Sequence, residues 1–172
     1  FVASILLTIS LGTIEAQVTG NRNVVVQNAL KKPGIQNTAD ITPLSIADKT
    51  QQVQYFDGLG RPLQTVMTQA GTGNRDIIMP MVYDEYGREI KKYKPYADVS
   101  NSGLGSFRAN AYVDQSSYYA VSGATGDGAR DNNPYAQTLI EFSPLGRVIQ
   151  AGAPGQTWQP GSKPVAYSYH VN

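Results

Sequence analysis

The sequence predicts an all-β fold, mainly antiparallel, in which related β-hairpins stack side by side and one long irregular insertion interrupts them. Three observations support this prediction. The first is the composition, with 17 Gly, 10 Pro and 11 Tyr among 172 residues. These residues suit many short strands joined by tight turns, whereas long helices need more Ala, Leu, Glu and Lys. The second is a repeated motif, and the third is its spacing.

The motif is an aromatic residue, then Asp or Ser, two variable residues, and Gly-Arg. Its copies lie within Gln54–Val66, Val82–Ile90 and Glu141–Ile149. The turn residues that they share are Asp57, Gly60 and Arg61, then Asp84, Gly87 and Arg88, then Ser143, Gly146 and Arg147.

A type I turn explains why these residue types recur. Its first position favours Asp or Ser, whose oxygen accepts a hydrogen bond from the N–H two residues on, and its fourth favours Gly. A left-handed Gly after the turn gives the bulged hairpin that commonly joins antiparallel strands. The Arg is then expected over a neighbouring ring or beside the turn carboxylate. Turn geometry accounts for the Asp and Gly without any chemistry.

The copies are unequally spaced. The interval is 27 residues from position 57 to 84 and 59 residues from 84 to 143. The second interval is a little over twice the first, so it holds either a degenerate unit or an insertion. Periods of this size are typical of stacked β arrays, in which each unit buries its face on its neighbours.

The phrase from Tyr83 to Arg88 resembles the YD repeat of bacterial RHS proteins. The longer phrases resemble the N-terminal domain of unknown function of secreted RHS-repeat proteins of Gram-negative bacteria, over roughly residues 22–172. These phrases are Gln54–Val66, Val82–Arg88, Lys94–Tyr96, Phe142–Arg147 and Gly152–Gly155. The resemblance implies a large β shell, often enclosing a C-terminal effector or toxin, with downstream repeats of the same polypeptide as partners. The third copy diverges, because Phe-Ser replaces Tyr-Asp.

The first residues predict secretion. Phe1 to Ala16 carries no charge until Glu15 and ends in small residues, which is typical of the apolar part of a signal peptide cleaved near Ala16. Residues 17–172 are then the β domain, continuing into repeats, and the protein is secreted or on the cell surface. A buried strand or helix is the open alternative. The stretch falls short of the ~20 residues of a membrane span, so none is expected in the mature form.

The predicted elements follow hydrophobic patterning and turn residues. Segment 76–83 is apolar on both faces and is expected to be covered on both. Pro80 within it predicts a bulge or an edge. Segment 106–112 is either a short helix or a strand, and 42–48 is expected to hold a short turn of helix. The remaining predicted strands are 23–27, 53–56, 63–67, 88–94, 117–121, 136–142, 148–151 and 165–171.

Composition excludes several classes of site. A net charge of +1 and 16% charged residues argue against a nucleic-acid interface. The chain has no Cys, hence no disulfide or thiolate. The loop 126–133 offers Asp127, Asp131 and Asn133 as calcium ligands, but Arg130 opposes a cation, and a plain solvated loop is favoured. No cofactor is predicted.

The sequence predicts a structural protein and not an enzyme. The only histidine, His170, lacks a nucleophile to activate. We expect a segment that starts or caps the β shell. One alternative is a module that binds carbohydrate or another surface through Trp158 and the lysines Lys91, Lys92 and Lys94. Another is a glycosidase, which needs two carboxylates about 5–10 Å apart, drawn from Asp57, Asp84 and Glu141.

Overall fold

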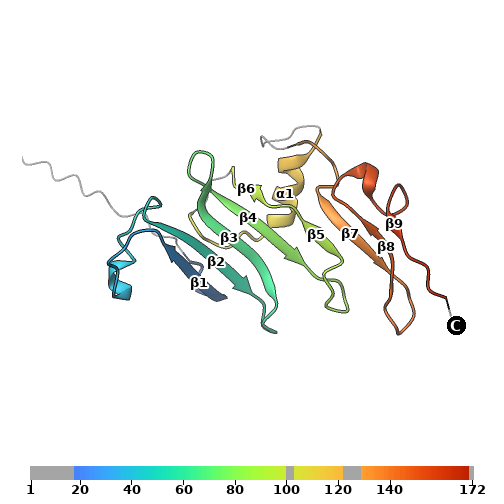
Figure 1. Ribbon diagram of the computed structural model, residues 1–172, viewed down its shortest axis with the longest axis horizontal. Coiled ribbons are helices and arrows are strands. Elements are labelled where there is room, and N and C mark those ends of the chain that lie inside the picture. Colours follow the sequence, from blue (N-terminus) through green and yellow to red (C-terminus); the bar gives the residue numbers. More distant parts are fainter. Residues whose placement is uncertain (1–17, 100–102, 122–128, 171–172) are drawn as a thin grey trace, which may run out of the picture.

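The computed structural model describes residues 18–99, 103–121 and 129–170. The predicted signal segment 1–16 lies outside these residues. Within them the strands form a sheet in the order β1-β2-β3-β4-β5-β7-β8-β9, with β6 also beside β4 (Figure 1). The strands are β1 (Asn23–Leu30), β2 (Lys49–Phe56), β3 (Pro62–Gly71), β4 (Arg75–Val82), β5 (Lys91–Tyr93), β6 (Tyr96–Ala97), β7 (Tyr135–Ile140), β8 (Val148–Gly152) and β9 (Val165–Ala166).

The predicted all-β, antiparallel fold is confirmed. Every neighbouring pair of strands in the described sheet is antiparallel. Because the strands run up and down in turn, alternate connections lie at the same end of the sheet. The β2–β3, β4–β5 and β7–β8 connections, which hold the three motif copies, all lie along the lower edge in Figure 1. We call each motif copy a corner, numbered one to three in chain order.

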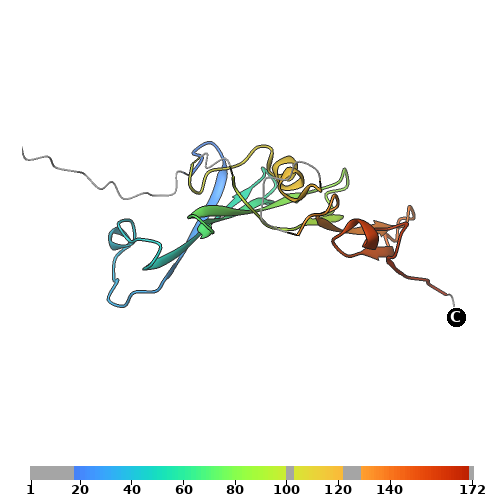
Figure 2. The same cartoon turned by 90° about the horizontal axis from the view of Figure 1, so that it is seen from above.

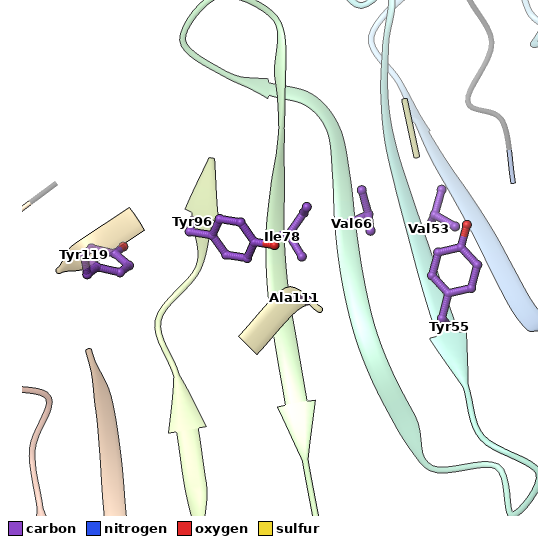
Figure 3. Close-up of a cluster of buried hydrophobic side chains, with 7 residues drawn as sticks. All are labelled: Val53, Tyr55, Val66, Ile78, Tyr96, Ala111 and Tyr119. Atoms are coloured by element: carbon purple, nitrogen blue, oxygen red, sulfur yellow. The ribbon is translucent and has the colours of Figure 1, made fainter. Parts of the chain in front are cut away.

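The core is a row of side chains that crosses the sheet. Val53, Val66 and Ile78 are each 0% exposed and pair in register from β2 to β4. Tyr96 of β6 pairs with Ile78 and is 3% exposed. Figure 3 shows the row together with Tyr55, with Ala111 near Ile78 and with Tyr119 beyond Tyr96 at the end of the row. The full cluster is Val53, Tyr55, Val66, Ile78, Tyr96, Ala111 and Tyr119.

The expectation that β4 is covered on both faces is wrong. Exposure alternates along the strand, with Ile78 at 0% and Met79 at 38%. The segment between β6 and β7, which contains the helix α1 (Ala111–Tyr119) and is called the insertion, covers one face only. Met79, on the other face, is therefore left partly open to solvent. Pro80 pairs in register with Gln64 and makes no bulge. Beyond it the other neighbour of β4 changes from β6 to β5, and a proline is tolerated where one side of a strand has no partner.

The prediction of a strand at 117–121 is also wrong, because the chain is helical up to Tyr119 and irregular at 120–121. The helix α1 (Ala111–Tyr119) lies on one side of the sheet (Figure 2) and packs on β4 and β6. Its aromatic residues favour a strand by propensity, but contacts with the rest of the fold decide otherwise. Ala111, Gln115 and Tyr119, spaced four apart, are buried. The Gln115 amide donates to the carbonyl of Pro134 at 2.7 Å, and the Tyr119 hydroxyl donates to that of Pro95 at 2.5 Å.

A buried ionic network attaches the insertion to the sheet. The guanidinium of Arg108, 8% exposed, lies 2.6 Å from the Asp98 carboxylate and 3.6 Å from that of Asp76 on β4. Its remaining donors reach the carbonyls of Gly103 and Ser106 and the Ser106 hydroxyl. The Gln64 side chain on β3 donates to the carbonyl of Arg108 and accepts its N–H, as the backbone of a neighbouring strand would. These bonds hold irregular backbone over the sheet at little cost in unpaired polar groups.

Three smaller expectations also need correction. The return strand predicted at 88–94 begins only at Lys91, because corner two continues to Ile90, whose N–H donates to the carbonyl of Arg88. The last strand, predicted at 165–171, is regular only over Val165–Ala166. The segment 42–48 contains turns, and the helical turn lies earlier, as the 3-10 helix η1 (Thr38–Asp40), where Asn37 and Asp40 form a capping box.

Candidate functional site: three corners at one edge of the sheet

Corner one has the predicted turn chemistry. The N–H of Gly60 donates to the carbonyl of Asp57 at 3.2 Å, and Gly60 has the left-handed φ of 79°. One Asp57 oxygen accepts the N–H groups of Leu59 and Arg61, and the other accepts Arg61 Nε at 2.7 Å. These bonds, that from the Arg61 N–H first, hold the pKa of Asp57 below its usual value.

Corner two repeats this arrangement bond for bond. One Asp84 oxygen accepts the N–H groups of Tyr86 and Arg88, and the other accepts Arg88 Nε at 2.9 Å. Gly87 has φ 76°. The backbone bond to Arg88 is again the main reason that the pKa of Asp84 is lowered. The predicted equivalence of the first two copies is therefore confirmed in atomic detail.

In corner three two residues share the role of the aspartate. Ser143 Oγ accepts the N–H of Leu145 at 3.2 Å, which is the turn bond. Arg147 pairs instead with Glu141, whose two oxygens accept its Nε at 2.8 Å and Nη2 at 3.0 Å. Sequence reasoning missed this role of Glu141. The available signal was a carboxylate two residues before the Ser that replaces Asp.

Adjacent corners are joined by an arginine and a tyrosine. The Arg61 guanidinium of corner one lies over the ring of Tyr83, which opens corner two, at 4.7 Å. The Tyr83 hydroxyl donates to the carbonyl of Pro62, the residue after that arginine, at 2.8 Å. A cation over a ring is stabilising, and the hydroxyl bond fixes the ring in place. We call this pair of contacts the corner joint.

The same joint recurs 22 residues after the arginine of corner three. The Arg147 guanidinium lies 4.7 Å from the centre of the Tyr169 ring, and the Tyr169 hydroxyl donates to the carbonyl of Val148 at 2.9 Å. The spacing is identical in both joints, from 61 to 83 and from 147 to 169. Tyr169 therefore occupies the place that Tyr83 has in corner two.

Corners two and three lack a joint in the described structure. Arg88 turns over Tyr86 of its own corner, at 4.9 Å. Phe142, the aromatic of corner three, is fully exposed. As a phenylalanine it has no hydroxyl to donate to a backbone carbonyl. Between the two corners lies a cleft of about 540 Å³.

Alanine at Gly60 and Gly87 should separate turn strain from the joint. Both glycines are left-handed, so each Ala costs about 1–2 kcal/mol in urea unfolding. A Cβ at Gly60 meets nothing within 4 Å, whereas one at Gly87 falls 2.8 Å from Arg61 Nη1. We expect Gly87→Ala to cost ~0.5–1 kcal/mol more, because it displaces the stacked guanidinium. In an Arg61→Ala background that difference should vanish, and its persistence would contradict the joint.

Acid should weaken corner three through Glu141. Its bonds to the Arg147 side chain and then to Ser143 lower its pKa from 4.5 to about 2. Because the folded pKa is the lower one, this stabilisation is complete above pH ~4.5 and is lost as pH falls through about 2. Thermal unfolding should place Glu141→Gln below wild type at pH 7, and the gap should close on acidification. A gap independent of pH would refute the assignment.

Two of the three lysines of the predicted ligand surface lie over tyrosine rings of the same chain. The Lys91 ammonium lies 4.6 Å from the centre of the Tyr135 ring, and the Lys94 ammonium lies 4.5 Å from that of Tyr119. Lys92 is exposed on β5. Trp158, in the 3-10 helix η2 (Gln156–Trp158), is 52% exposed. Binding of a glycan or another surface by these residues stays a prediction.

The other candidate sites show no assembled chemistry among the described residues. Asp131 Oδ1 accepts the N–H groups of Asn133 and Gln156, and Asp127 lies outside the described ranges. No cluster of three metal-ligating side chains occurs anywhere in residues 18–99, 103–121 and 129–170. His170 contacts Ser168 Oγ at 3.3 Å. The three candidate glycosidase carboxylates are the corner residues, and their lowered pKa values favour the ionised form, whereas a glycosidase acid needs a raised one.

The family described as a domain of unknown function, DUF6443, matches residues 29–171. The chain belongs to the DUF6443 family. The match covers all three corners and both corner joints of this DUF6443 domain. No curated protein and no solved structure matches the chain. Within the described residues, no helix of the DUF6443 domain is long and apolar enough to cross a membrane.

Proposed function

We propose that this DUF6443 domain is a non-catalytic structural segment at the start of a secreted or cell-surface RHS/YD-repeat protein. It starts or caps a β shell, which in such proteins can enclose a C-terminal effector or toxin. In this role the corners are repeated structural units in the wall of that shell. Their aspartates and arginines form hydrogen bonds with one another and with the backbone. These side chains therefore stabilise the turns.

The recurrence of the corner joint supports the proposal most strongly. A joint that appears twice with the same contacts and the same spacing is a unit that can be repeated along a sheet. Tyr169 lies beyond β8 on the side of β9, an outer strand of the described sheet. Its position favours a further hairpin of the same kind beside β9, because the tyrosine of a joint opens the next corner.

The test is a cryo-EM structure of the natural polypeptide together with a protection assay. We expect hairpins with the same motif to pair beside β9 and the wall to surround a C-terminal module. Deleting residues 18–170 should open the wall and make that module sensitive to added protease. The substitution Leu145→Ala, at an exposed position of corner three, serves as a control that leaves protection intact. A β9 edge paired with an unrelated fold, or equal protection without the domain, would refute the proposal.

A further inference from the structure

The cleft between corners two and three has an unusual lining. It is lined by side chains from both corners and by Ile90 and Ile140 of the hairpins that carry them. Two aromatic residues border it, Tyr86 at 73% exposure and Phe142 fully exposed. Exposed aromatic residues beside a concave surface are characteristic of binding sites.

Comparison with the two closed joints shows which group is missing here. At each closed joint the arginine of a corner lies over the ring of a tyrosine 22 residues further along the chain, at 4.7 Å. At the open position Arg88 covers Tyr86 instead. In the described structure the Phe142 ring has no cation or second ring against it. The cleft is therefore bordered by an uncovered ring, that of Phe142, whereas at both closed joints a guanidinium covers the corresponding ring.

The charge of the lining favours a cation. Three carboxylates line the cleft, from Asp84, Glu85 and Glu141, against one guanidinium, that of Arg88. Asp84 is paired with Arg88, and Glu141 with Arg147. Glu85 is exposed and takes part in none of the ion pairs of the described residues. One unpaired carboxylate and one uncovered ring thus border the same cleft.

We propose that this cleft binds an arginine side chain of a partner protein. The guanidinium stacks on the Phe142 ring, and its N–H groups donate to Glu85. Arginine fits better than lysine, because its planar cation stacks on a ring and still presents donors to a carboxylate. The partner thereby supplies from outside the contact that Arg61 and Arg147 make within the chain. This assignment does not depend on the shell proposed above.

The proposal can be tested by NMR titration of the whole chain at low salt. The probes are the peptides acetyl-Gly-Arg-Gly-amide and acetyl-Gly-citrulline-Gly-amide, which differ in the charge of one side chain. A neutral oligosaccharide, maltohexaose, is the third probe. We expect saturable shifts of amides around Glu85 and Phe142 with the arginine peptide alone, weakened by added salt.

Variants identify the groups responsible. Phe142→Leu keeps an apolar side chain but removes the ring, and should weaken binding of the arginine peptide about two- to fivefold. Glu85→Gln should weaken it to a similar extent. Leu145→Ala is the matched control, since Leu145 is 72% exposed in the same corner but does not line the cleft. Because Phe142 is fully exposed, its replacement leaves the fold intact. Equal shifts with citrulline, shifts with maltohexaose alone, or no saturable shift would each overturn the proposal.

Discussion

Replacing Arg108 by methionine should destabilise the domain by about 3–5 kcal/mol, because it leaves two buried carboxylates without their cation. The Asp76 and Asp98 side chains are 1% and 7% exposed, and both lie against this guanidinium. The carbonyls of Gly103 and Ser106 also lose the hydrogen bonds that this guanidinium donates. The free energy of unfolding in urea, followed by tryptophan fluorescence, measures the effect.

Two further variants show whether charge is the cause. Arg75→Met removes an exposed arginine from β4 and should change stability by less than about 0.5 kcal/mol. Adding Asp76→Asn and Asp98→Asn to Arg108→Met removes the uncompensated charges and should restore part of the loss. If Arg108→Met behaves like Arg75→Met, the insertion is not held by this network.

Replacing Ile78 by alanine should cost about 2–5 kcal/mol, the range for a large aliphatic side chain removed from a packed core. Ile78 is 0% exposed and lies in the cross-strand row between Val66 and Tyr96. The same substitution at Ile149 of β8, which is 37% exposed, is the matched control and should cost much less. Denaturant unfolding of both variants provides the comparison. Equal losses would mean that the row is not the centre of the core.

The corners were predictable because their geometry is local. A turn that needs an Asp oxygen at its first position and a left-handed Gly at its fourth is encoded within four residues, as at Asp57 and Gly60. The left-handed φ of Gly60 and the hydrogen bonds that Asp57 accepts follow from that rule. The pairing of Arg61 with Asp57 was expected for the same reason, since the two residues belong to the same turn.

The insertion was not predictable by the same rules, because distant contacts determine it. The helix α1 contains Tyr and Val residues that favour strands, and its burial on β4 and β6 outweighs that preference. The pattern that could have revealed it is the spacing of Ala111, Gln115 and Tyr119. Arg108 gave no signal at all, since its carboxylate partners come from separate segments of the chain.

The covered and open faces of the sheet also escaped prediction. Alternation in β4 places Ile78 and Met79 on opposite faces. Because both residues are apolar, the composition of the strand does not indicate which face is buried. The buried face is the one on which the insertion packs. Similarly, the joint between Arg147 and Tyr169 spans 22 residues and became visible only when the two hairpins were placed side by side.

A double-mutant cycle between Arg61 and Tyr83 tests most directly the claim that the corners are joined to one another. Urea unfolding of Arg61→Ala, Tyr83→Ala and the double variant should give a stabilising coupling of about 0.5–1 kcal/mol. A parallel cycle between Arg88 and Phe142, the equivalent pair at the open cleft, should give a coupling near zero. Additive losses at Arg61 and Tyr83, or equal coupling in both cycles, would contradict the account.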